Sequence, residues 1–121
     1  MNETNLLGLR SVIYPVDDVE KSKAWWTKVL GIEPYFDQPF YTGYNIGGFE
    51  LGLFPGGLKE NGPITYWGIE DIDSAFLHFT HNAATVVSGV EEVGDGIKVA
   101  VLCSTTGEIF GLIYNPHFKI A

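Results

Sequence analysis

The sequence predicts an α+β fold made of two similar βαβββ modules, and three observations support this prediction. Val16-Asp17-Asp18-Val19 is matched 53 residues later by Ile69-Glu70-Asp71-Ile72. GFELGL at residues 48–53 is matched 59 residues later by GEIFGL at residues 107–112. Both pairs keep the same order around one helical pattern and a run of β-type segments, so a duplicated module is much likelier than a chance similarity.

In the first half of the chain, residues 9–16 predict a strand because apolar side chains alternate toward one face. A helix is expected next. Asp17 or Asp18 supplies its N-cap, and Gly31 stands where a C-terminal glycine belongs. Three further strands are expected at residues 32–36, 40–47 and 49–54, with turns at residues 37–39 and 47–48.

The second half repeats this order after a polar, glycine-rich linker at residues 56–62. A β-type run begins at Ile64, and Asp71 or Asp73 caps the helix that follows. The side chains expected on the inner face of that helix are Ile72, Ala75, Phe76, Phe79 and Ala83. The last strands are expected at residues 85–90, 97–104 and 109–115, which gives one domain over residues 5–118 with modules at about 6–55 and 63–118.

Composition narrows the classes of partner. The chain has 121 residues, of which 45% are hydrophobic and 18% are charged, enough for one globular core. A net charge of -8 argues against nucleic acid and against an anionic membrane, and it serves either solubility or attraction of a cationic ligand. Cys103 is the single cysteine, so no internal disulfide is expected. Without an export signal or a membrane span in the sequence, a cytoplasmic protein is expected.

Residues 14–34, YPVDDVEKSKAWWTKVLGIEP, resemble the opening of the vicinal-oxygen-chelate superfamily of glyoxalases, bleomycin-resistance proteins and extradiol dioxygenases. GIEDIDSAFLHF at residues 68–79 resembles the start of that superfamily's second module, and GEIFGLIYNPHF at residues 107–118 is similar to its last strand and tail. The resemblance implies a curved mixed sheet whose two modules wall a cleft for a small molecule. It also implies pairing of two copies of the chain.

Metal-dependent members of that superfamily carry a ligand, usually His, Gln or Glu, on the first and last strand of each module. The resemblance transfers these positions to Ser11, Gly52, Ile64 and Gly111. None of these side chains is a good metal ligand, and a shift by two residues adds only Glu50 and Tyr66. We therefore expect a site that works without a metal or another cofactor.

Strand alternation places other side chains on the same cleft wall. Glu50 is the most informative, because a carboxylate in an apolar strand is hydrated at an edge, paired, or functional. In the cleft it holds a cationic group or acts as a general base. Loop aromatics stack on a ligand or contact a partner chain. The expected ligand-binding residues are Ser11, Ile13, Tyr35, Phe40, Tyr41, Tyr44, Glu50, Gly52, Phe54, Ile64, Tyr66, Ile109, Gly111 and Ile113.

Three functions remain open. The leading hypothesis is a metal-independent small-molecule binding protein that forms a homodimer. The second is an enzyme of the lyase, isomerase or dioxygenase type that uses Glu50 and a tyrosine, or metal ligands outside the transferred positions. The third is an interaction module that uses the aromatic loop. Elsewhere, at least one of Trp25 and Trp26 is expected in the core, and His117 is expected to anchor the tail or to cap a turn.

Overall fold

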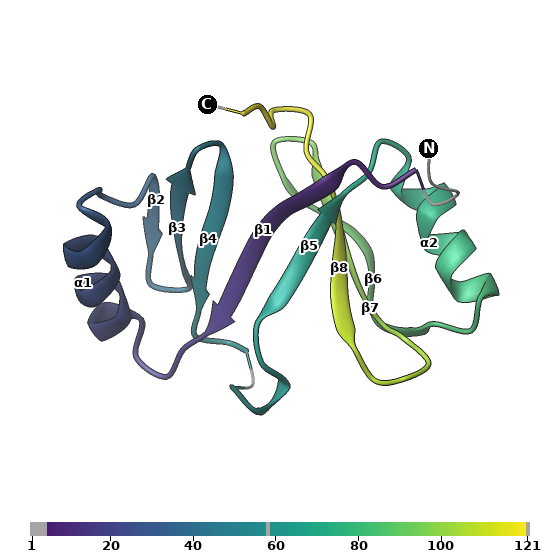
Figure 1. Cartoon of the computed structure of the whole chain (residues 1–121), viewed down its shortest axis with the longest axis horizontal. Coiled ribbons are helices and arrows are strands. Elements are labelled where there is room, and N and C mark those ends of the chain that lie inside the picture. Colours follow the sequence, from purple (N-terminus) through teal and green to yellow (C-terminus); the bar gives the residue numbers. More distant parts are fainter. Residues whose placement is uncertain (1–4, 58, 121) are drawn as a thin grey trace. The chain divides into compact units, whose positions relative to one another are not determined.

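Both halves of the chain follow the element order βαβββ in the computed structural model, which describes residues 5–57 and 59–120 (Figure 1). The first half contains β1 (Gly8–Pro15), α1 (Val19–Leu30), β2 (Phe36–Gln38), β3 (Tyr41–Ile46) and β4 (Phe49–Phe54). The second half contains β5 (Ile64–Gly68), α2 (Ile72–His81), β6 (Thr85–Gly94), β7 (Ile97–Cys103) and β8 (Ile109–Tyr114). The α+β prediction and the repeat are therefore confirmed.

The two halves also share one pattern of strand pairing. The first has the strand order β2-β3-β4-β1 and the second has the order β5-β8-β7-β6. The first strand of each half, β1 or β5, pairs in parallel with the last strand of that half, and the other pairs within each half are antiparallel. Ile13 stands opposite Gly52 in the first half, and Tyr66 stands opposite Gly111 in the second.

By compactness, the described chain divides into two units. The N-terminal module contains residues 11–57 and 59–64 together with 119–120, and the C-terminal module contains residues 5–10 and 65–118. The segment before β1 belongs to the C-terminal module because the amide of Leu7 donates a hydrogen bond to the carbonyl of Gly68 (2.8 Å). The two modules are described separately below.

Side-chain capping starts both helices, as their sequences suggest. Asp18 rather than Asp17 caps α1, since one of its carboxylate oxygens accepts from the amides of Glu20 (3.1 Å) and Lys21 (3.2 Å). Asp71 rather than Asp73 caps α2 and accepts from an amide one turn later (3.0 Å). These hydrogen bonds lower the pKa of Asp71. Gly31 ends α1 with φ 72°, which a glycine adopts without strain.

Each module buries one apolar cluster between its helix and its strands. In the N-terminal module, Val16, Tyr44, Leu51 and Leu53 pack against α1. Trp26 packs on this cluster and its ring stacks on Tyr14 at 5.9 Å, whereas Trp25 is 58% exposed. In the C-terminal module, the buried cluster consists of Ile69, Ile72, Ala75, Ala100, Leu102 and Leu112.

Several local predictions are corrected. Asp37 and Gln38 belong to β2, so that turn lies farther along, at residues 39–40. Ala83 is not on the inner face of α2: the helix ends at His81, and Ala83 is exposed in a left-handed conformation with φ 71°. The linker includes a 3-10 turn at Lys59–Asn61. His117 anchors the tail as expected, by donating from Nε2 to the carbonyl of Asp95 (2.9 Å).

In the part of the chain that the structure describes, neither helix is long and apolar enough to cross a bilayer.

The capping geometry predicts different effects for two neighbouring aspartates. Asp18→Ala removes the acceptor for two helix amides and is expected to lower the free energy of unfolding by about 1 kcal/mol. Asp17→Ala is the matched control, because Asp17 makes only an exposed ion pair with Lys59 (3.4 Å) and its loss is expected to cost less than about 0.5 kcal/mol. Urea unfolding measures both, and equal losses would contradict the assignment of the cap.

Candidate functional site

The strands of the N-terminal module have one face that packs against α1 and one face that no helix of this module covers in the described residues (Figure 1). Tyr44, Leu51 and Leu53 point toward α1, because they belong to the cluster beneath it. Side chains alternate along a strand, so the intervening positions lie on the opposite side, which we call the helix-free face. It carries Ser11, Ile13, Tyr41, Gly43, Glu50, Gly52 and Phe54.

Glu50 lies at the centre of a polar group on the helix-free face. The hydroxyl of Tyr35 donates a hydrogen bond to Glu50 Oε1, and the hydroxyl of Tyr41 donates one to Oε2. Glu50 itself is half-buried. Among residues 5–57 and 59–120, no Lys, Arg or His forms an ion pair with it. Two tyrosine hydroxyls, and no positive charge, therefore hold this carboxylate in place.

Two glycines make room for the tyrosine rings. Gly43 of β3 stands directly opposite Gly52 of β4. A Cβ atom at Gly43 would lie 3.1 Å from a ring carbon of Tyr35 and 3.3 Å from one of Tyr41. At Gly52 it would lie 2.0 Å from the Tyr41 hydroxyl oxygen, which is closer than real atoms approach. Both tyrosines thus lie against bare backbone, and a side chain at position 52 would overlap the Tyr41 hydroxyl that donates to Glu50.

Tyr35 remains a hydrogen-bond donor at neutral pH. Tyr35 is 62% exposed as a whole, but partial loss of water around its hydroxyl raises its pKa, and the hydrogen bond to the Glu50 carboxylate raises it further. A phenol with a raised pKa keeps its proton through the physiological range. Tyr35 is therefore suited to donate a hydrogen bond or a proton, and it is not suited to act as a phenolate base.

Two of the aromatic residues predicted to bind a ligand do not join this group. Tyr44 is fully buried beneath α1: its hydroxyl donates to the carbonyl of Lys23 (3.0 Å) and accepts from the hydroxyl of Thr27 (2.8 Å). Tyr44 is a core residue in this structure, because β3 turns its even-numbered side chains toward the helix. Phe40 lies in the turn after β2, 56% exposed, with its ring 5.9 Å from that of Phe36.

The C-terminal module repeats the glycine arrangement with one tyrosine. A Cβ atom at Gly111 would lie 2.3 Å from a ring carbon of Tyr66, so that ring covers the glycine. Burial raises the pKa of Tyr66, and the nearby negative charge of Glu91 adds to the shift. Since Phe110 and Leu112 pack toward α2, Ile109 and Ile113 lie with Gly111 on the other face of β8. Ile64 is half-buried at the start of β5.

Sequence reasoning missed two residues of these surfaces. Gly43 was not expected at the site, although it lies two residues after Tyr41, on the same face of β3. Glu91 was missed because the predicted strand ends at residue 90, whereas β6 continues to Gly94 through several register shifts.

The residues at the superfamily's metal positions do not fit a metal ion. Gly52 and Gly111 have no side chain, and tyrosine rings occupy the space beside both glycines. Ser11 offers one hydroxyl and Ile64 offers no donor atom. Among residues 5–57 and 59–120, no three His, Cys, Asp or Glu side chains come close enough together to hold an ion. The residues at these positions therefore provide no support for metal-dependent chemistry.

Comparison with known proteins places the chain in a family. Residues 8–107 match the model of the Glyoxalase/Bleomycin resistance protein/Dioxygenase superfamily, so the chain belongs to that superfamily. No curated protein matches the sequence.

Solved structures share the fold at low sequence identity. Methylmalonyl-CoA epimerase from Streptomyces coelicolor, in complex with 2-nitronate-propionyl-CoA, has a TM-score of 0.76 and 13% identity over 96% of this chain and 99% of that chain. A glyoxalase/bleomycin resistance protein/dioxygenase superfamily member from Vibrio splendidus 12B01 has a TM-score of 0.67 and 18% identity over 88% of this chain and 97% of that chain. At these identities the likeness establishes the fold alone.

The close approach of Tyr41 to the backbone predicts a specific effect of one methyl group. In Gly52→Ala, the new Cβ overlaps Tyr41 and touches Ile13. Overpacking of this kind is expected to lower the free energy of unfolding by about 1–3 kcal/mol and to separate Tyr41 from Glu50. Urea unfolding measures the first effect, and the chemical shifts of the Tyr41 ring measure the second.

Gly89→Ala is the matched control for this substitution. It is another strand glycine with ordinary backbone angles, and nothing lies within 4 Å of the added methyl group. Its stability is expected to stay within about 0.5 kcal/mol of the wild type. If Gly52→Ala behaved like Gly89→Ala and left the Tyr41 ring shifts unchanged, the proposed packing of Tyr41 would be wrong.

Proposed function

We propose that this superfamily member is a metal-independent small-molecule binding protein. Its site is the helix-free face of the N-terminal module, and its ligand is an organic cation with an apolar or planar body. The single observation that carries the proposal is the pair of hydrogen bonds from Tyr35 and Tyr41 to the two oxygens of Glu50. A carboxylate fixed between two aromatic rings combines the two groups that attract such a cation.

The tyrosine rings, the Glu50 carboxylate and the net charge of the chain each attract a cation separately. An aromatic ring next to a cation contributes about 0.5–1 kcal/mol at an exposed site and about 2 kcal/mol where water is excluded. Glu50 adds a negative charge for which no cationic side chain competes in the described part of the chain. The net charge of -8 raises the local concentration of cations and disfavours anionic ligands.

The hydrogen bonds also favour binding over proton abstraction. Both oxygens of Glu50 already accept from a tyrosine, so a substrate proton has to compete with a hydroxyl for the same carboxylate. An ionised carboxylate held in this way still attracts positive charge through its remaining lone pairs.

One observation favours an enzyme as the second candidate. Tyr35 carries a retained proton next to a carboxylate, and such a pair serves general acid–base catalysis in a lyase or isomerase. The epimerase named above is an enzyme built on the same fold. A binding protein returns its ligand unchanged, whereas an enzyme converts it, so recovery of the bound molecule separates the two candidates.

Homodimerisation and a cytoplasmic location are parts of the same proposal. Phe36 and Phe40 are 38% and 56% exposed near the outer strand β2, and they offer an apolar surface to a second copy of the chain. Cys103 is a free thiol, which agrees with a reducing compartment.

The proposal predicts the behaviour of Glu50→Gln toward a defined probe, benzyltrimethylammonium. The wild-type protein is expected to bind this cation with NMR shift changes at Tyr35, Tyr41 and Glu50. Glu50→Gln keeps the shape of the side chain but removes its charge, and it is expected to weaken binding about tenfold, which corresponds to about 1.4 kcal/mol. The dissociation constant is obtained from the titration.

Two controls make this titration specific. Glu33→Gln makes the same change of net charge at an exposed acid of the same module and is expected to leave the affinity nearly unchanged. Benzyl alcohol retains the ring without the cation and is expected to bind far more weakly than benzyltrimethylammonium. Equal affinity of the two Gln variants for the cation would exclude Glu50 as the binding group.

A further inference from the structure

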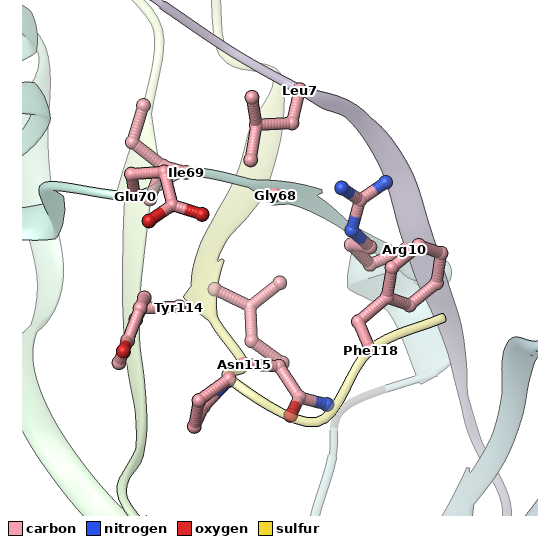
Figure 2. Close-up of a pocket in the computed structure, with 10 residues that line it drawn as sticks. Leu7, Arg10, Gly68, Ile69, Glu70, Tyr114, Asn115 and Phe118 are labelled. Atoms are coloured by element: carbon pink, nitrogen blue, oxygen red, sulfur yellow. The ribbon is translucent and has the colours of Figure 1, made fainter. Parts of the chain in front are cut away.

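The C-terminal module contains a pocket that the proposed function does not use. It lies between the segment leading into β1, the residues that join β5 to α2, and the tail after β8 (Figure 2). Its volume is about 270 Å³, somewhat below the usual range for drug-sized ligands, so it suits a small metabolite. Its lining includes two charged side chains, Arg10 and Glu70, together with Gly68, Asn115 and Phe118.

Arg10 is held in a fixed position at one side of the pocket. Its guanidinium carbon lies 3.7 Å from the centre of the Phe118 ring. A Cβ atom at Gly68 would lie 2.6 Å from Arg10 Nε and 2.9 Å from Cζ, so the guanidinium also lies close to bare backbone. Arg10 is thus held by the Phe118 ring and by the backbone of Gly68, and the N–H donors of a guanidinium lie along the edge of its plane.

This guanidinium has no acidic partner within the residues that the structure describes. Its one recorded hydrogen bond is a long contact of Nη1 with the carbonyl of Leu9 (3.5 Å). Burial lowers the pKa of Arg10, as expected for a charge that its surroundings do not compensate. Across the pocket, Figure 2 shows the carboxylate of Glu70 directed into the same space.

We infer that this pocket binds a small zwitterion, whose carboxylate pairs with Arg10 and whose ammonium group faces Glu70. Planar guanidinium groups recognise carboxylates through paired hydrogen bonds, and the contact with Phe118 holds the Arg10 guanidinium beside the pocket. The inference is independent of the Glu50 site, because every residue of this pocket belongs to the C-terminal module.

Charge explains why a zwitterion fits better than a simple anion. The chain carries a net charge of -8, and Glu70 lies in the pocket itself, so an anion without a positive group meets repulsion both at long range and locally. A simple cation gains from Glu70 but meets the uncompensated charge of Arg10. A ligand with both groups satisfies the two sides of the pocket together.

Three isosteric probes test this inference by NMR titration: L-leucine as the zwitterion, leucine amide as the cation and 4-methylpentanoate as the anion. L-leucine is expected to bind at least about fivefold more tightly than either of the others. Shift changes are expected at the amides of Gly68 and Asn115. Arg10→Gln is expected to remove the preference for L-leucine over leucine amide. Glu70→Gln is expected to remove the preference for L-leucine over 4-methylpentanoate.

Controls separate loss of recognition from loss of structure. Glu70 is exposed, so Glu70→Gln keeps the fold and tests the pocket even if Arg10→Gln loosens the tail. Lys28→Gln and Glu33→Gln repeat the two charge changes in the other module and are expected to leave all three affinities unchanged. The inference is overturned if no probe shifts these amides, if the three probes bind equally, or if both pocket variants keep the wild-type preferences.

Discussion

The contact of Tyr41 with the bare backbone at Gly52 is the constraint on which the site in the N-terminal module depends. Without a side chain at positions 43 and 52, two tyrosine rings reach the level of the strands and both donate to Glu50. The carboxylate is thereby fixed and satisfied in a protein that supplies it with no cation in the described residues. The glycine at a position where metal-dependent members of the superfamily carry a ligand also leaves the room that the Tyr41 side chain occupies.

In both modules a tyrosine lies against a strand glycine, but the groups around the tyrosine differ. Gly52 and Gly111 stand at matching positions of the duplicated fold, and a tyrosine ring covers each of them. In the N-terminal module the covering ring comes from β3 and reaches Glu50. In the C-terminal module it comes from β5, and its acidic neighbour is Glu91. The two modules therefore share the open space at the glycine but differ in the groups that surround it.

The fold was largely predictable from local patterns. Helix caps act through contacts within a few residues, so the sequence narrows each N-cap to two nearby aspartates and places Gly31 at the end of the first helix, and the structure selects Asp18 and Asp71. The errors lie where tertiary pairing overrides local preference. The turn-forming pair Asp37-Gln38 becomes part of an edge strand because β3 provides its partner. Ala83 fits a helical pattern, yet the chain leaves the helix two residues before it.

The site was only partly predictable, because strand alternation assigns a face but not a contact. Alternation placed Glu50 and Gly52 on one face correctly, and the same rule, applied to β3, would have moved Tyr44 into the core. The convergence of Tyr35 on Glu50 depends on the pairing of β2 and β3, which one sequence does not specify. Arg10 and Phe118 lie more than one hundred residues apart, and their stacking had no local signal.

The central claim is that the glycine and tyrosine arrangement replaces the metal site of the superfamily. The most direct test is the metal content of protein purified without chelator, combined with thermal unfolding in the presence of Zn²⁺, Ni²⁺, Mn²⁺, Fe²⁺ and Co²⁺, since a ligand of the folded state raises its melting temperature. We predict no ion at one per chain and no saturable rise in Tm. One ion per chain, or a saturable rise in Tm that is lost in Glu50→Gln, would contradict the account.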